Sequence, residues 1–127
     1  MANEAELRLR QEDPIDFTVA DNVGIEKGSL LTLHDPRAAS GATVGGPCAG
    51  VARREKISGD GRTRLAVFRK GIFDVHASGA VVLGQNVQMA ESNDVMLAAT
   101  GASGAVIIGT ALETAANDET FQIQLNL

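Results

Sequence analysis

Few residues in this chain are able to do covalent chemistry. The sequence has one cysteine, Cys48, and two histidines, His34 and His76. A nucleophilic cysteine needs a histidine beside it as a base, and no local motif around Cys48 supports such a pair. The small residues of 46–50 around Cys48 are more typical of a packed thiol. We therefore expect no enzyme activity, and one cysteine allows no intrachain disulfide.

Two short segments contain side chains that bind metals in other proteins. His34–Asp35 offers two ligands, and Asp74 and His76 share one face of an expected strand. A zinc site needs at least three convergent protein ligands, and the sequence identifies no third one for either pair. The paired carboxylates Asp118–Glu119 fall in an expected hairpin turn, where short polar side chains serve the backbone. The prediction is no catalytic residue, no metal and no cofactor.

A glycine-rich segment, 41–46, lies in the least structured part of the chain, from Arg37 to Pro47. A phosphate-binding loop would continue with lysine and then serine or threonine, whereas here Pro47 and Cys48 follow. We expect a flexible surface loop, and a loop of this length in a small domain is often a contact site. An alternative function is a surface binding module for a host receptor or carbohydrate. The absence of Trp and Tyr disfavours it, because such sites usually stack aromatic rings on sugars.

The charge distribution also limits the classes of partner. The formal net charge of −5 disfavours binding to a nucleic-acid backbone. Seven basic residues nevertheless fall between positions 53 and 70: Arg53, Arg54, Lys56, Arg62, Arg64, Arg69 and Lys70. This cluster suits a solvated strand face, a contact between subunits, or DNA association; we favour the first and predict no nucleic-acid partner. No segment has the ~18 apolar residues of a membrane span, so we predict no membrane partner.

The elements that would position these residues are short strands. Of the 127 residues, 14 are glycines, and the apolar residues are almost all aliphatic. A unit of roughly 60 residues recurs in the sequence: Gly50-Val51-Ala52-Arg53 and the strand near Arg62–Phe68 are echoed by Gly109-Thr110-Ala111-Leu112 and Thr120–Leu125. We predict a mainly β fold, a small compact β-barrel or β-sandwich-like domain over 15–127 with internal duplication of 24–73 and 80–127. At most one short helix is expected, at 111–116.

Residues 1–14 are expected to form an extended, flexible N-terminal arm that ends at Asp13-Pro14. Leu7 and Leu9 alternate with charged residues, which is the pattern of an edge strand on this subunit or on a neighbour. A disordered tail is an equally good interpretation. We expect the fold to survive loss of this arm.

The second half of the sequence resembles the head decoration, or capsid cement, proteins of tailed phages. Four segments carry the resemblance: Phe68-Arg69-Lys70-Gly71-Ile72-Phe73-Asp74, Ala80-Val81-Val82-Leu83-Gly84-Gln85-Asn86-Val87, Ile108-Gly109-Thr110-Ala111-Leu112-Glu113-Thr114-Ala115 and Phe121-Gln122-Ile123-Gln124-Leu125-Asn126-Leu127. The order of these motifs along the chain is the order in that family.

The resemblance implies a structural protein that binds the outer surface of a phage head and stabilises it, made in the host cytoplasm and carried on the virion exterior. It implies the major capsid protein and two further copies of the same chain as partners, in a homotrimer at local threefold positions. The arm would then contact the capsid through Glu6, Leu7, Arg8, Leu9 and Arg10. Basic residues would contact the neighbouring subunits, namely Arg53, Arg54, Arg69 and Lys70.

Overall fold

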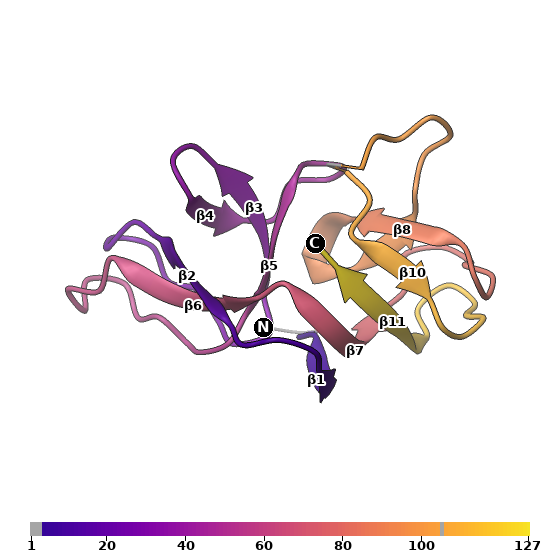
Figure 1. Cartoon of the computed structure of the whole chain (residues 1–127), viewed down its shortest axis with the longest axis horizontal. Coiled ribbons are helices and arrows are strands. Elements are labelled where there is room, and N and C mark those ends of the chain that lie inside the picture. Colours follow the sequence, from indigo (N-terminus) through magenta and orange to yellow (C-terminus); the bar gives the residue numbers. More distant parts are fainter. Residues whose placement is uncertain (1–3, 105) are drawn as a thin grey trace.

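The protein is mainly β in a computed structural model that describes residues 4–104 and 106–127 (Figure 1). The described strands are β1 (Glu6–Arg10), β2 (Ile15–Thr18), β3 (Leu30–His34), β4 (Ala38–Gly41), β5 (Cys48–Ala52), β6 (Arg64–Phe68), β7 (Lys70–His76), β8 (Asn86–Met89), β9 (Val95–Leu97), β10 (Gly109–Ala111) and β11 (Thr120–Asn126). A single 3-10 turn, η1 (Glu91–Asn93), is the helical element of the described residues. The predicted fold class is confirmed.

The first half of the chain closes into a five-stranded barrel, in the order β2-β4-β3-β5-β6. Alternating residues of these strands face inward, as the period of two requires. The barrel core contains Phe17, Leu31 and Val67, all at most 3% exposed. This barrel is the half of Figure 1 drawn from indigo to magenta.

The second half forms a six-stranded sheet in the order β1-β7-β11-β10-β8-β9. A parallel bridge between Ala77 and Val95 brings β9 to the end of β7, so the sheet curls back toward itself. Its core includes Phe73 and Ile123, and the same cluster contains Leu30 and Phe68 from the barrel strands. The two halves therefore share this buried cluster, while a second cluster lies within the barrel.

The two halves also use matching backbone pairings. Leu31 pairs with Gly50 in the barrel as Val87 pairs with Gly109 in the sheet. The bridge between Ile25 and Lys56 corresponds to the bridge between Val81 and Ala115. The matching strands run through 15–68 and 70–126.

One local prediction is wrong. Residues 38–41, expected in an irregular loop, form β4, which pairs with β3 over four residues and with β2 at its start. Tertiary pairing overrides local propensity here, because propensity is a weak influence in short segments. Residues 111–116, where at most a short helix was expected, end β10 and then turn toward the Ala115 bridge.

The N-terminal segment is partly built into the fold. Residues 6–10 form β1, which pairs antiparallel with β7, so the structure has the edge strand on the same subunit. Ala5 is 8% exposed and belongs to the core cluster, and Leu7 packs against that cluster. Loss of this segment would therefore remove core contacts, contrary to the expectation that the fold does not need it.

Candidate functional site

A surface cleft of about 780 Å³ separates β1 from the barrel. One wall is the segment from Glu4 to Leu7, and the other consists of Lys27, Arg53 and Phe68. Lys27 lies here because the backbone N–H of Ala5 donates a hydrogen bond to the carbonyl oxygen of Gly28 at 2.9 Å. Chain segments that are far apart in the sequence thus form one recess.

The β1 side chains have different environments. Arg8 Nε donates a hydrogen bond to Asp74 Oδ2 at 2.6 Å, and this bond raises the pKa of the Arg8 guanidinium above its usual value. Glu6 Oε2 lies 3.5 Å from Arg8 Nη2, and Arg10 Nη2 lies 3.9 Å from Asp13 Oδ1. Leu9 is 54% exposed, because a bulge between Leu7 and Leu9 shifts the register of β1 against β7. β1 therefore presents an exposed leucine between paired charges.

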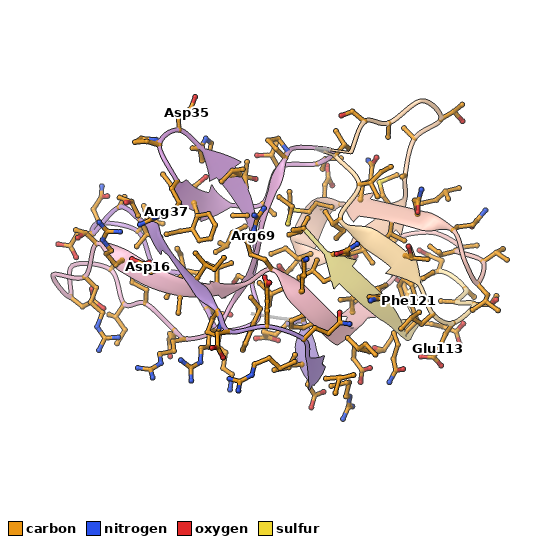
Figure 2. The ribbon with its side chains drawn as sticks, in the orientation of Figure 1. Asp16, Asp35, Arg37, Arg69, Glu113 and Phe121 are labelled. Carbon is orange, nitrogen blue, oxygen red and sulfur yellow. The ribbon has the colours of Figure 1, made fainter. Side chains whose placement is uncertain are left out.

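The four basic residues predicted to contact other subunits lie in different places. Arg53 lines the cleft beside β1, and Arg54 next to it is exposed. Lys70 begins β7 and is half-buried opposite Asn126. Arg69 lies at the junction of the two halves (Figure 2), where its Nε donates to the carbonyl oxygen of Ala49 at 3.1 Å. Its guanidinium carbon is 5.8 Å from the centre of the Phe17 ring, so this charge is engaged within the chain.

The basic cluster of the sequence does not form one continuous charged face. Arg64 Nη1 donates to Asp16 Oδ2 at 2.9 Å, while Arg37 lies on the other side of that carboxylate at 3.8 Å (Figure 2). Arg62 lies 4.0 Å from Asp60, and Lys56 is buried. Aspartates therefore neutralise part of the positive charge that the sequence concentrates between residues 53 and 70.

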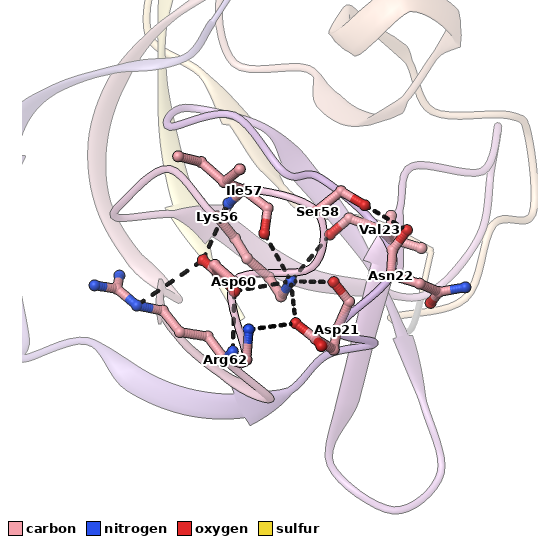
Figure 3. Close-up of polar contacts among 9 residues, drawn as sticks. Asp21, Asn22, Val23, Lys56, Ile57, Ser58, Asp60 and Arg62 are labelled. Atoms are coloured by element: carbon pink, nitrogen blue, oxygen red, sulfur yellow. Dashed lines mark hydrogen bonds and ion pairs between the residues drawn. The ribbon is translucent and has the colours of Figure 1, made fainter.

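Lys56 occupies an unusual position, because its side chain is fully buried at the tip of the barrel (Figure 3). Its ammonium group donates to the carbonyl oxygens of Asp21 at 2.7 Å, and of Val23 and Ile57 at 3.3 Å. The carboxylates of Asp21 and Asp60 lie 3.6 and 3.4 Å from the same nitrogen. The ammonium thus adds to the direct links between the two turns, which include hydrogen bonds from the Gly61 N–H to Asp21 Oδ1 at 2.7 Å and from Ser58 Oγ to the Asn22 carbonyl oxygen at 2.9 Å. This is a structural role.

The residues considered for covalent or metal chemistry are buried or already hydrogen-bonded to other side chains. Burial raises the pKa of the Cys48 thiol to about 12, so it is protonated at neutral pH. His34 Nε2 hydrogen-bonds Ser40 Oγ at 2.6 Å, and His76 Nδ1 hydrogen-bonds Asp94 Oδ1 at 2.9 Å. Within residues 4–104 and 106–127, no three metal-binding side chains gather. No helix of that part is long and apolar enough to cross a membrane.

Sequence reasoning missed three residues of structural or surface importance. Lys27 reaches the cleft only through the Ala5–Gly28 contact, for which no local signal exists. Lys56 was grouped with surface charges. Asn93, 7% exposed, links η1 to the barrel by accepting a hydrogen bond from Leu30 N at 2.6 Å. An asparagine at a φ of 64° is a recognised turn signal, but its partner is 63 residues away.

Comparison with known proteins shows which family and which solved structure this chain is similar to. Residues 9–127 match the model of a family described as phage cement protein. Among solved structures, the fold is similar to the head fiber gp8.5 N base in bacteriophage phi29, with a TM-score of 0.60 and 16% sequence identity over 88% of this chain and 93% of that chain. No curated protein matches the sequence. Because the family match covers nearly the whole chain, this protein belongs to the phage cement protein family.

Proposed function

We propose that this protein is a capsid decoration protein that binds the outer surface of a phage head and stabilises it as a trimer at local threefold positions. The observation that carries the proposal is the family match over residues 9–127. A capsid-associated structural role follows from the family. The outer surface, the trimer and the threefold positions belong to the proposal.

The surface of the chain suits contact with large partners. Several large apolar side chains are at least 40% exposed: Leu9, Ile15, Val23, Val44, Ile57, Val82, Leu83 and Leu97. Apolar side chains of this kind supply binding free energy at protein interfaces. We assign the contact with the capsid to the β1 side of the molecule, through Leu9 and its neighbours.

The proposed contacts between subunits involve fewer basic residues than the sequence predicted. Arg54 and Lys70 have no ion-pair partner among the described residues, so they are available to a neighbouring chain. Arg69 is bound to Ala49 and lies against Phe17, so we leave it out. A cyclic trimer needs a head-to-tail contact, in which a patch on one subunit meets a different patch on the next.

Two measurements on the purified protein test this proposal. Light scattering should give three times the chain mass, and the protein should co-sediment with empty heads of its own phage up to one trimer per local threefold position. Decorated heads should also resist heating better than bare heads, because binding to the intact shell stabilises it. A monomer that does not sediment with heads would contradict the proposal.

A further inference from the structure

The barrel tip surrounds the Lys56 ammonium with five oxygen atoms, which we call the oxygen cage (Figure 3). Three are backbone carbonyl oxygens, of Asp21, Val23 and Ile57, at 2.7, 3.3 and 3.3 Å from the nitrogen. The other two are carboxylate oxygens of Asp21 and Asp60, at 3.6 and 3.4 Å. Carbonyl and carboxylate oxygens are also the ligands that Ca²⁺ takes in proteins. The oxygen cage thus has the chemistry of a cation site, and its cation is a side chain.

Hydrogen bonds that do not involve the ammonium hold the two carboxylates in place. The Gly61 N–H donates to Asp21 Oδ1 at 2.7 Å. The Arg62 N–H donates to Asp60 Oδ1 at 2.9 Å, and the Ile57 N–H donates to Asp60 Oδ2 at 3.2 Å. Outer partners of this kind orient the ligands of metal sites. The carboxylates are therefore positioned by the backbone, and they keep their places when the ammonium is removed.

The second half of the chain shows that the turn itself does not need a lysine. The bridge formed by Lys56 in the barrel corresponds to the bridge formed by Ala115 in the sheet. The Asp21 carbonyl oxygen accepts a hydrogen bond from the turn after Lys56, and the Ala77 carbonyl oxygen accepts the matching bond in the second half. Alanine thus stands at both positions there, so the lysine and the aspartate occur together or are replaced together. We expect Lys56→Ala to fold for the same reason.

The charge of the oxygen cage without its ammonium is negative. Asp21 and Asp60 contribute two carboxylates, and the exposed Arg62, whose Nε lies 4.0 Å from Asp60, contributes one positive charge. The Asp60 side chain is 22% exposed, and attraction between charges is stronger where water is partly excluded. The Asp21 side chain is 43% exposed, so an ion can enter from solvent on that side. This excess of negative charge favours a divalent cation.

We propose that the barrel tip is a cation site for which Lys56 supplies the cation, and that without this side chain the oxygen cage binds Ca²⁺. Its oxygens need only move inward slightly to reach the bonds of about 2.3–2.6 Å that Ca²⁺ makes. Mg²⁺ fits poorly, because it requires near-ideal octahedral geometry at about 2.0–2.1 Å. The natural chain carries its cation covalently, so the order of the tip is independent of the Ca²⁺ supply. This inference goes beyond the proposed function and does not rest on it.

Thermal unfolding with and without CaCl₂ tests the site. In about 10 mM CaCl₂ the unfolding midpoint of Lys56→Ala should rise by about 5 °C, because a cation that binds only the folded state stabilises it. The wild-type midpoint should be the same in CaCl₂ and in EDTA, since the ammonium fills the oxygen cage. Lys56→Met is the matched control: its uncharged side chain occupies the space of the lysine, so CaCl₂ should leave its midpoint unchanged. Isothermal titration calorimetry should find about one Ca²⁺ per chain in Lys56→Ala and none in wild type.

Two further comparisons separate a site from charge screening. MgCl₂ at the same ionic strength should raise the Lys56→Ala midpoint much less than CaCl₂, and the double variant Lys56→Ala/Asp21→Asn should lose the response to CaCl₂. An equal rise with MgCl₂, or a rise of the same size in wild type, would overturn the proposal. So would a Lys56→Ala protein whose midpoint does not respond to CaCl₂, or one that is unfolded and whose circular dichroism spectrum CaCl₂ does not restore.

Discussion

At the scale of single residues, Lys56 is the side chain whose environment differs most from what its type suggests. A lysine is almost never fully buried unless its charge is paired. Lys56 meets this condition with three carbonyl oxygens and two carboxylates from the turns at 21–23 and 57–60. Val23 and Ile57, two exposed apolar residues, lie on the turns that this ammonium holds together. The buried charge therefore fixes the shape of an apolar tip of the barrel.

Lys56→Met should lower the free energy of unfolding by about 3 kcal/mol, because it leaves the surrounding carbonyls and carboxylates without their buried cation. Urea denaturation measures this loss. Lys27→Met is the matched control, since Lys27 is exposed and has no partner among the described residues, and its unfolding free energy should stay within about 0.5 kcal/mol of wild type. Equal losses of unfolding free energy in both variants would contradict the proposal that the buried Lys56 ammonium stabilises the two turns.

The environment of Asp60, beside Lys56, makes the stability of the fold depend on pH. A hydrogen bond from the Arg62 backbone N–H lowers the pKa of the Asp60 carboxyl, and the Ile57 N–H and Lys56 lower it further. Because the folded pKa is below the unfolded one, the carboxylate stabilises the fold at neutral pH, and this contribution is lost as pH falls through the folded pKa.

The difference in stability between wild type and Asp60→Asn should thus be present at pH 7 and shrink below about pH 4. Asp35→Asn, in an exposed turn, controls for the removal of any one carboxylate. A difference that stays constant down to pH 2 would show that Asp60 acts through its shape alone.

At the scale of elements, two glycines allow the strands of each half to approach closely. A Cβ atom at Gly50 would collide with the Phe68 carbonyl oxygen, and one at Gly109 would collide with the Gln124 carbonyl oxygen. These glycines occupy matching positions in the paired units. The recurring glycine in the sequence thus marks a place where backbone meets backbone, which is one of the few functions that only glycine serves.

Gly50→Ala and Gly109→Ala should each destabilise the protein by about 3 kcal/mol or more, because the obstructing atoms belong to the backbone and cannot rotate away. Thermal unfolding measures the effect. Gly41→Ala is a suitable control, since nothing lies within 4 Å of its added Cβ, and it should be close to neutral. A tolerant Gly109→Ala variant would show that β10 and β11 can separate without loss of the fold.

At the scale of the whole molecule, the two halves form one cooperative unit. Leu30, Val51 and Phe68 of the barrel strands lie in the same buried cluster as Phe73 and Phe121 of the sheet. The Asn93 side chain and the Ala5–Gly28 bond add polar links between the halves. Each half alone would expose part of this shared core.

Unfolding of the full chain should therefore show a single transition, with calorimetric and van't Hoff enthalpies in agreement. A fragment of residues 70–127 should fail to fold on its own, because it lacks both β1 and the barrel side of the core. Two separated transitions in the full chain would contradict one cooperative core.

The sequence by itself determined the fold class, because alternating apolar residues and glycine turns permit few other structures. It also determined the family resemblance, which the match over residues 9–127 confirms. Cys48 was predicted to be a packed residue, and its burial agrees with that prediction. These properties depend on residue type and local spacing, which a sequence states directly.

Only the tertiary structure decided what the charged residues do. Basic residues close together in the sequence have different environments: Lys56 is buried, Arg69 lies against the Phe17 ring, and Arg53 lines a cleft. It also decided that residues 6–10 join the sheet as β1, since their alternation fits a strand on any open edge. Several partners in these contacts are twenty or more residues away, such as Asp21 for Lys56 and Ala49 for Arg69, and charge has no periodicity that reveals them. The cleft beside β1 exists because the fold brings together residues 4–7, Lys27, Arg53 and Phe68.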